Sequence, residues 1–269
     1  MADSMVWETL VKEAKEVASK ERILSKVLTE FILERDNLCD ALGWRLAARL
    51  VKNSVPESDI RDLIKKAFTE DREMLESVEF DLIAVTERDP ACNDFISPFL
   101  YYKGFQALCC YRVANSLWKQ NRKDLALYLQ SLVAVVYSVD IHPAAIIGKG
   151  ILLDHATGFV AGETTVIEDN VSILHEVTLG GTGKERGDRH PKIRSGVLIG
   201  AGAKILGNVE IGEGSRIGAS SVVLNDVSPH VSVAGVPAKE IGKIKNVSPA
   251  LGMDHNLLEM REYESGGGI

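Results

Sequence analysis

Three short segments in the second half of the chain carry residues suited to acid–base chemistry. They read Val139-Asp-Ile-His-Pro, Leu153-Asp-His-Ala-Thr-Gly and Gly187-Asp-Arg-His-Pro-Lys-Ile-Arg. A hydroxyl group is essentially never ionised at neutral pH, so it attacks a thioester only when a base within hydrogen-bond reach takes its proton. Histidine, with a pKa of about 6.5, suits this task, and a nearby carboxylate fixes its tautomer. His155 is therefore a candidate base and Asp140 a candidate orienting carboxylate.

The elements that position these residues follow a six-residue repeat. Aliphatic side chains recur at this step at Ile193, Ile199, Ile205, Ile211, Ile217 and Val223. An earlier block has the same step at Ile141, Ile147, Leu153 and Phe159, and then, after a slip of two residues, at Ile167, Ile173 and Leu179. This pattern is the signature of a hexapeptide β-helix, whose turns must stack to enclose their aliphatic column. The slip predicts a bulged corner after Phe159.

The candidate residues interrupt this repeat. Asp154 and His155 follow the inward Leu153, so they occupy a corner that other turns fill with small residues. A single such histidine is explained equally well as a structural corner residue. Stacking brings positions roughly 18 residues apart into register, which Asp140 matches only approximately. The polar, glycine-rich run 180–190, between Leu179 and the next repeat, predicts a loop expelled from the coil.

The first half of the chain has a helical pattern. Leu24, Val27, Leu28 and Phe31 fall on one face at three- and four-residue spacing, and the stretches 98–118 and 122–138 indicate two further helices. We therefore predict an α+β chain with an all-helical oligomerisation domain at 1–138, a left-handed parallel β-helix at 139–245 and a flexible tail at 246–269. The flat outer faces of such a β-helix need partners, which predicts an oligomer.

Composition excludes several other classes of protein. The formal charge of −7 and the absence of a long Lys/Arg block argue against a nucleic-acid partner. The four cysteines form no C-x-x-C pair, so disulfides and a zinc knuckle are not expected. No secretion signal and no apolar run long enough to span a membrane is visible. These observations favour a cytoplasmic protein that binds neither a membrane nor a metal.

Several motifs resemble the bacterial and plant serine acetyltransferases. They are Asp140-Ile-His-Pro-Ala-Ala, Leu153-Asp-His-Ala-Thr-Gly, Thr178-Leu-Gly-Gly-Thr-Gly-Lys, Ala234-Gly-Val-Pro-Ala and, in the helical half, Arg88-Asp-Pro-Ala. The resemblance implies transfer of an acetyl group from acetyl-CoA to the hydroxyl of L-serine, the first step of cysteine biosynthesis from serine. It also implies inhibition by the end product L-cysteine.

The resemblance assigns roles to individual residues. His155 is the general base and Asp140 orients it. Asp89, Asp154, Arg189 and His190 hold the serine: a guanidinium binds a carboxylate through two parallel hydrogen bonds, and the two acids receive the ammonium. For acetyl-CoA the family pattern indicates Gly181, Gly183, Ala201, Gly202, Ala219 and Lys239.

The resemblance also predicts partners. Relatives form homotrimers or dimers of trimers. In the family a terminal isoleucine inserts into O-acetylserine sulfhydrylase, the enzyme that uses the product, and Ile269 follows three glycines at the end of this chain. A flexible stem with one apolar side chain and a free carboxylate suits such capture, although an ordinary frayed terminus looks the same.

Three alternatives remain open from the residues alone. A hexapeptide acetyltransferase for sugars or another hydroxyl would share the fold and the histidine, but it would have no use for Asp89 and Asp154. A γ-type carbonic anhydrase would need a pair of zinc-binding histidines at five-residue spacing, which the chain lacks. A purely structural scaffold would leave the charged loop without a purpose.

Overall fold

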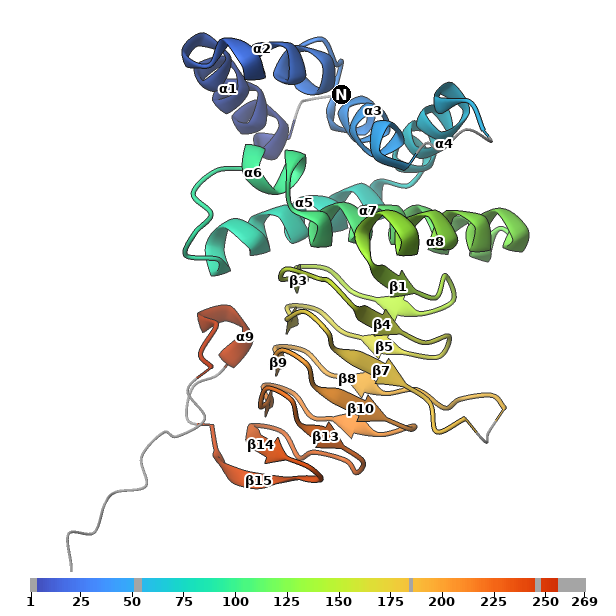
Figure 1. Cartoon of the computed structure of the whole chain (residues 1–269), viewed down its shortest axis with the longest axis vertical. Coiled ribbons are helices and arrows are strands. Elements are labelled where there is room, and N and C mark those ends of the chain that lie inside the picture. The colour runs from blue at the N-terminus through green and yellow to red at the C-terminus, as the bar shows by residue number, and fades with distance from the viewer. Residues whose placement is uncertain (1–3, 51–54, 184–185, 245–247, 256–269) are drawn as a thin grey trace, which may run out of the picture.

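The chain folds into a layer of helices set on one end of a three-sided parallel β-helix (Figure 1). The computed structural model describes residues 4–50, 55–183, 186–244 and 248–255. Within these ranges, none of the helices is long and apolar enough to cross a lipid bilayer. The helical elements are α1 (Met5–Lys20), α2 (Arg22–Leu28), a π-helix (Thr29–Leu33), α3 (Leu38–Leu50), α4 (Glu57–Glu70), α5 (Arg72–Arg88), α6 (Ile96–Leu100), α7 (Lys103–Lys119), α8 (Lys123–Tyr137) and α9 (Pro249–Gly252).

Capping side chains fix where two of the long helices begin. The Ser4 side chain accepts a hydrogen bond from the backbone N–H of Trp7 at the start of α1, and Asp71 does the same for Met74 at the start of α5. Each such cap stabilises its helix by about 1 kcal/mol because it satisfies an otherwise unpaired N–H. The single helix predicted over 98–118 is wrong: α6 ends at Leu100, and α7 begins only at Lys103.

The β-helix consists of three sheets, which the chain visits in the order A, B, C. Sheet A contains β1 (Val139–Ile141), β4 (Phe159–Ala161), β7 (Thr178–Gly180), β10 (Lys204–Leu206) and β13 (Val222–Val223). Sheet B contains β2 (Ile146–Ile147), β5 (Val166–Ile167), β8 (Lys192–Ile193) and β11 (Glu210–Ile211). Sheet C contains β3 (Leu152–Leu153), β6 (Ser172–Ile173), β9 (Leu198–Ile199), β12 (Arg216–Ile217), β14 (Val231–Gly235) and β15 (Ala238–Lys243). The repeat predicted from the sequence is confirmed, because its isoleucines line the buried core, except for the half-buried Ile147, which packs against it.

Strand pairing locates the two places where a turn is longer than its neighbours. Ile141 pairs with Ala161 and Ala161 with Leu179, so the first of these turns is two residues longer than the second. The two extra residues lie in the corner between β3 and β4, which carries His155. The predicted position of the slip, after Phe159, is therefore wrong. Phe159 and Ala161 both point into the core, and this hides the true register in the sequence.

The second long turn contains the expelled loop. Thr178 pairs with Lys204 and Lys204 with Val222, so the turn between the first two is eight residues longer. All of this excess lies between β7 and β8, on the opposite side of the β-helix from β3 (Figure 1). The predicted loop is confirmed, and it replaces a single corner.

Helix α7 joins the helical layer to the first turn of the β-helix. The Tyr111 hydroxyl donates to the Ala145 carbonyl at 2.5 Å. Arg112 pairs with Asp81 of α5, both almost fully buried, and the second oxygen of Asp81 accepts from the backbone N–H of Ile151 at 2.9 Å. Removing one partner of a buried ion pair leaves an uncompensated charge and costs about 3–5 kcal/mol. This pair therefore holds two helices and one corner of the β-helix in a single arrangement.

The segment after the β14–β15 hairpin returns along sheet C. Ser172 of β6 donates to the Ala250 carbonyl at 3.0 Å, and Asp254 pairs with Arg216 at 3.2 Å. Residues 248–255, which the sequence analysis assigns to a flexible tail, are thus folded against the sheet, and α9 lies beside it (Figure 1). The end of the tail, with Ile269, lies outside the described residues. The division of the chain into domains stays a prediction.

A close contact at the start of α7 gives the first testable expectation. A Cβ at Gly104 would lie 1.9 Å from the carbonyl oxygen of Leu153, so only glycine allows α7 to approach β3. Gly→Ala inside a helix normally stabilises by roughly 0.5–1 kcal/mol. We expect Gly104→Ala instead to destabilise the protein by about 1–3 kcal/mol, as overpacking does. Thermal unfolding measures this, with Gly252→Ala in α9, where the added carbon meets nothing within 4 Å, as control. A stabilised Gly104→Ala protein would refute the contact.

Candidate active site

The corner that carries His155 has a strained backbone. His155 and Ala156 both adopt positive φ angles, 54° and 58°, which non-glycine residues rarely do. The corner is held by hydrogen bonds within itself, such as that from the Thr157 N–H to the His155 carbonyl at 2.7 Å. Lys103, at the start of α7, donates to the Thr157 hydroxyl. The longer corner thus projects the His155 side chain outward, where 75% of it is exposed.

A cavity of about 520 Å³ lies between this corner and the helical layer. Three predicted site residues line it together: Asp89, Asp154 and His155. Asp154 Oδ2 lies 3.8 Å from Nε2 of His155. Asp89 is the cap residue that directly follows α5, and its side chain accepts from the Ala91 N–H at 2.9 Å, which fixes its place at the end of the helix. Two carboxylates and an imidazole therefore face one space large enough for an amino acid.

Asp140 is close in the fold to the His155 corner but has another partner. It pairs in register with Val160 of β4, the strand that follows this corner. Its Oδ1 accepts a hydrogen bond from Gln130 of α8 at 2.6 Å. Among the described residues, the carboxylate within ion-pair distance of His155 is Asp154. The role of Asp140 as the orienting carboxylate stays a prediction.

His175 is a neighbour of His155 to which the sequence analysis assigned no role. The two rings meet edge to face, with centroids 5.9 Å apart. Leu153 pairs with Ile173, so the residues two positions later lie beside each other on adjacent turns. The two histidines are 20 residues apart in the sequence, and they can be predicted to be neighbours only once the first turn is known to be 20 residues long.

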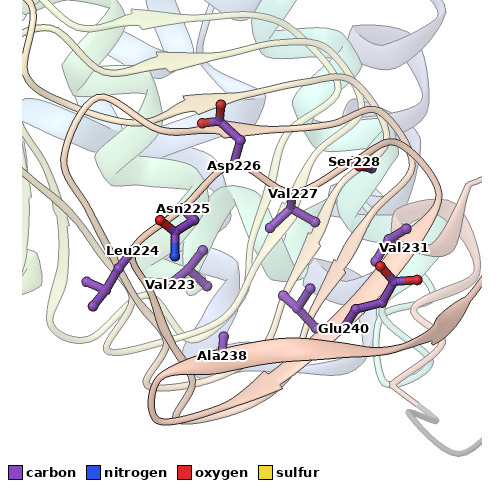
Figure 2. A pocket seen from close by; sticks show the side chains of 10 residues that line it. Val223, Leu224, Asn225, Asp226, Val227, Ser228, Val231, Ala238 and Glu240 are labelled. Carbon is purple, nitrogen blue, oxygen red and sulfur yellow. The ribbon is translucent and has the colours of Figure 1, made fainter.

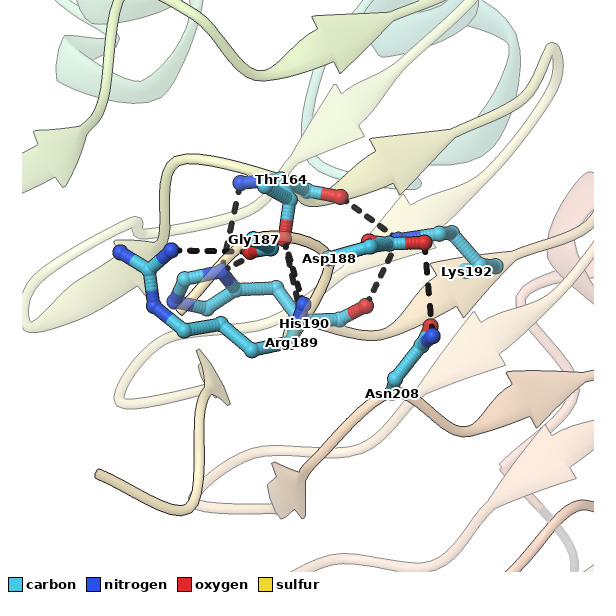
Figure 3. A network of polar contacts seen from close by, with 7 residues as sticks. All are labelled: Thr164, Gly187, Asp188, Arg189, His190, Lys192 and Asn208. Carbon is cyan, nitrogen blue, oxygen red and sulfur yellow. Dashed lines mark hydrogen bonds and ion pairs between the residues drawn. The ribbon is translucent and has the colours of Figure 1, made fainter. Parts of the chain in front are cut away.

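The expelled loop brings Arg189 and His190 onto the corner between β4 and β5 (Figure 3). The Thr164 hydroxyl accepts from the backbone N–H groups of Arg189 and His190 at 3.0 and 3.1 Å, and the Thr164 N–H donates to Nδ1 of His190 at 3.2 Å. Arg189 also pairs with Glu163 at 2.8 Å. A Cβ at Gly162 would lie 2.0 Å from Nε2 of His190. Gly162 and Thr164 together hold the His190 ring in place: the ring packs against the Gly162 backbone and accepts a hydrogen bond from Thr164.

A second set of contacts ties the loop to the β-helix. The Lys192 ammonium bonds to the carbonyl oxygens of Thr164 and His190 and to the carboxylate of Asp188, which Asn208 also contacts (Figure 3). The hydrogen bond from Lys192 lowers the pKa of Asp188, so this carboxylate stays ionised. The C-terminal end of the loop is thus bonded to the β-helix through Thr164, Lys192 and Asn208.

Electrostatics keep the His190 ring neutral. Burial lowers the pKa of His190, and the positive charges of Arg189 and Lys192 lower it further. The hydrogen bond from Arg189 lowers the pKa of Glu163, which therefore remains an anion beside the guanidinium. His190 is then a neutral hydrogen-bonding group next to the guanidinium of Arg189, which is paired with Glu163. This combination suits a carboxylate ligand.

The two clusters lie on different edges of the three-sided β-helix. His155 lies on the C–A edge, formed by the corners between sheets C and A, whereas Arg189 and His190 lie on the A–B edge. One chain therefore does not bring all the predicted serine-binding residues together.

Three of the residues predicted for acetyl-CoA continue the edge on which His155 lies. Ala201, Gly202 and Ala219 are in successive C–A corners, and the Gly202 N–H donates to the His175 carbonyl at 2.9 Å. Gly202 has a φ of 73°, which glycine adopts without strain. Lys239 lies in β15, whereas Gly181 and Gly183 belong to the expelled loop on the A–B edge. A small pocket under the β14–β15 hairpin, lined by Asp226 and Glu240 among others, contains none of the predicted site residues (Figure 2).

Comparison with known proteins places this geometry in a family. Residues 6–110 match the model "Serine acetyltransferase, N-terminal", and residues 190–225 match "Bacterial transferase hexapeptide (six repeats)". The serine acetyltransferase of Salmonella typhimurium is 50% identical over 266 residues, which cover 98% of this chain and 97% of that protein.

Solved structures agree over nearly the whole fold. The serine acetyltransferase of Vibrio cholerae superposes with a TM-score of 0.92 at 54% identity, covering 94% of this chain and 98% of that one. A serine acetyltransferase in complex with cysteine gives a TM-score of 0.91 at 50% identity, covering 93% and 97%. That of Brucella abortus in complex with coenzyme A gives 0.88 at 49% identity, covering 90% and 96%.

These likenesses identify the solenoid as the left-handed β-helix of hexapeptide proteins, with the predicted helical region before it. They cover both the cavity and the loop. The chain therefore belongs to the serine acetyltransferase family, and it transfers the acetyl group of acetyl-CoA to the hydroxyl of L-serine.

Proposed function

We propose that His155 is the general base of this transfer. It removes the proton of the serine hydroxyl as that oxygen attacks the thioester carbonyl, and the proton then passes to the departing CoA thiolate. The observation that carries this proposal is the cavity that joins His155 to Asp89 and Asp154. The two carboxylates receive the serine ammonium, which favours an amino acid over a neutral alcohol. Asp140, on the neighbouring strand, orients the imidazole.

The transfer proceeds directly, without an acyl-enzyme. The four cysteines are buried, and burial raises the pKa of each thiol. A protonated thiol is a poor nucleophile. Serine and acetyl-CoA therefore react in a ternary complex, with acetyl-CoA lying along the C–A edge past Ala201, Gly202 and Ala219. Lys239 belongs to this site, and Gly181 and Gly183, which lie on the A–B edge, join it from a neighbouring copy of the chain.

The serine site is completed between two copies of the chain. Arg189 and His190 lie on a different edge from His155, and a threefold arrangement of three-sided prisms places the A–B edge of one copy beside the C–A edge of the next. The guanidinium of one subunit then binds the carboxylate of the serine whose ammonium faces the acids of its neighbour. A homotrimer, or a dimer of trimers, is the assembly that this geometry supports.

The remaining roles follow from the family. L-Cysteine differs from L-serine by one atom and occupies the same site as a feedback inhibitor, in keeping with the cysteine complex of a relative. The C-terminal Ile269 binds O-acetylserine sulfhydrylase. The reaction takes place in the cytoplasm.

Release of the CoA thiol tests the chemistry. The wild-type protein is expected to release thiol from acetyl-CoA with L-serine and much more slowly with D-serine or L-homoserine. His155→Ala should lower kcat by about 10²–10⁴, the usual contribution of a general base. Turnover of neutral alcohols alone would leave the fold assignment intact and remove the roles of Asp89, Asp154 and Arg189.

Mixing inactive variants tests the shared site. His155→Ala and Arg189→Ala are each expected to be inactive alone, but co-refolding them at equal amounts should restore about a quarter of wild-type activity, because that share of interfaces combines an intact base with an intact arginine. The matched control mixes His155→Ala with Asp89→Ala, whose sites come from the same chain and stay defective. Equal activity in both mixtures would contradict a site shared between subunits.

Gly162, which lies against the His190 ring, provides a test at a position remote from the catalytic base. In Gly162→Ala the new carbon would overlap the imidazole, so His190 and Arg189 must move. We expect kcat/KM for serine to fall by about 10²-fold, the usual effect of displacing a positioning group by 1 Å. Gly242→Ala, where the added carbon meets nothing within 4 Å, is the control and should behave as wild type. An unchanged kcat/KM in Gly162→Ala would mean that the loop does not touch the substrate.

A further inference from the structure

Arg88 is a buried charge at the end of α5 that the proposed reaction does not use. It is the last residue of the helix and is 5% exposed, and the residue directly after it is Asp89, whose carboxylate lines the cavity. Arginine is rarely buried unless specific partners hold its guanidinium, because removing the charge from water is costly. The partners of Arg88 therefore indicate what this side chain does.

The guanidinium of Arg88 binds two side chains in the second turn of the β-helix. Nη1 donates to the hydroxyl of Ser172 in β6 at 3.2 Å, and Nη2 donates to Oδ1 of Asn170, in the corner before β6, at 3.2 Å. Ser172 is fully buried, and Asn170 has a φ of 59°, which asparagine tolerates better than most residues. One rigid, planar group thus joins the end of α5 to two adjacent points of the β-helix.

Gly150, in the first turn, leaves room for this contact. A Cβ at this position would lie 2.6 Å from Oδ1 of Asn170 and 3.7 Å from Nη2 of Arg88. Any larger residue would collide with the oxygen that accepts the hydrogen bond. The glycine therefore keeps Asn170 accessible to the guanidinium.

A second contact on the same face of α5 makes Arg88 important for the direction of the helix. Asp81 accepts from the Ile151 N–H, in the first turn of the β-helix, at 2.9 Å. Val85 and Arg88 follow Asp81 at four- and three-residue spacing, so all three buried side chains face the β-helix. With Asp81 as the only anchor, α5 could pivot about that point. The anchor at Arg88, seven residues later and on the next turn, fixes the end of the helix.

We propose that Arg88 is a positioning residue for serine: by holding the end of α5 on the second turn of the β-helix, it sets the place of the Asp89 carboxylate. The inference rests on the proposed function, in which Asp89 and Asp154 receive the serine ammonium. A binding group contributes fully only when it is held within about 0.5 Å of its productive position. Arg88 is not among the described residues that line the cavity, so it acts through Asp89.

Steady-state kinetics of the full-length protein test this role. Arg88→Met removes the donors and keeps an unbranched side chain. We expect the KM for L-serine to rise by about tenfold, whereas kcat and the KM for acetyl-CoA change by less than about threefold, because a contact with a charged group of serine is weakened and the base is untouched. Arg88→Lys, which keeps the charge but not the planar fork, should give an intermediate KM. An equal loss in all three constants would mean general disruption and would contradict the proposal.

A second variant leaves the arginine in place and removes one of its acceptors. In Asn170→Gly the glycine adopts the φ of 59° without strain, so the corner keeps its shape. We expect the KM for L-serine to rise severalfold. Asn121→Gly, at a φ of 60° in the exposed turn after α7, is the matched control and should keep the wild-type constants. An Asn170→Gly protein with the wild-type KM for serine would overturn the proposal.

A double-mutant cycle separates this inference from the function on which it rests. Asp89→Asn alone should raise the KM for L-serine, because the ammonium loses a carboxylate. Adding Arg88→Met to Asp89→Asn should then have little further effect, since no carboxylate is left to position. An unchanged KM in Asp89→Asn would remove the role of Asp89 in the proposed function, and the role of Arg88 with it. A raised KM in Asp89→Asn, with a full additional effect of Arg88→Met, would keep the role of Asp89 and overturn only that of Arg88.

Discussion

Stacking of the β-helix turns is the constraint on which the rest of the structure depends. Each strand pairs in register with the strands of the turns before and after it, so the backbone ladder closes only if every turn has the same length within the stack. Residues in excess of that length have no strand to join and are expelled at a corner. Both segments that carry the chemistry, the His155 corner and the loop with Arg189, are such excess residues. The regular turns below them provide a rigid base for the irregular ones.

The helical layer adds the second wall of the site. Helix α7 crosses the first turn so closely that a glycine is needed at position 104, and the buried pair of Asp81 and Arg112 fixes α5 and α7 against the corner before β3. Because Asp89 caps the end of α5, this pair also helps to fix the position of that carboxylate in the wall of the cavity. Neither the helices nor the β-helix alone would enclose a substrate.

Much of the fold and of the candidate site was predictable from the sequence, and each prediction that was wrong or missed has a physical reason. The six-residue repeat predicted the β-helix, its inward residues and the expelled loop, because one side chain per strand must fill a narrow core. The slip was assigned to the wrong corner because Phe159 and Ala161 are both buried in one three-residue strand. The break between α6 and α7 was missed because apolar periodicity continues through it. Contacts of the Thr164 hydroxyl and the edge-to-face meeting of His155 and His175 depend on register between turns, which a single sequence leaves open.

The buried cysteines have a consequence for the durability of the enzyme. Acetyl-CoA is a thioester, and any accessible thiolate exchanges with it to give an acetylated protein and free CoA. The CoA thiol that each cycle releases is also prone to form mixed disulfides with exposed cysteines under oxidising conditions. Cys39, Cys92, Cys109 and Cys110 are all shielded, and burial keeps them protonated. The fold therefore protects its own cysteine thiols from reaction with the thioester of acetyl-CoA and with the CoA thiol released at its surface.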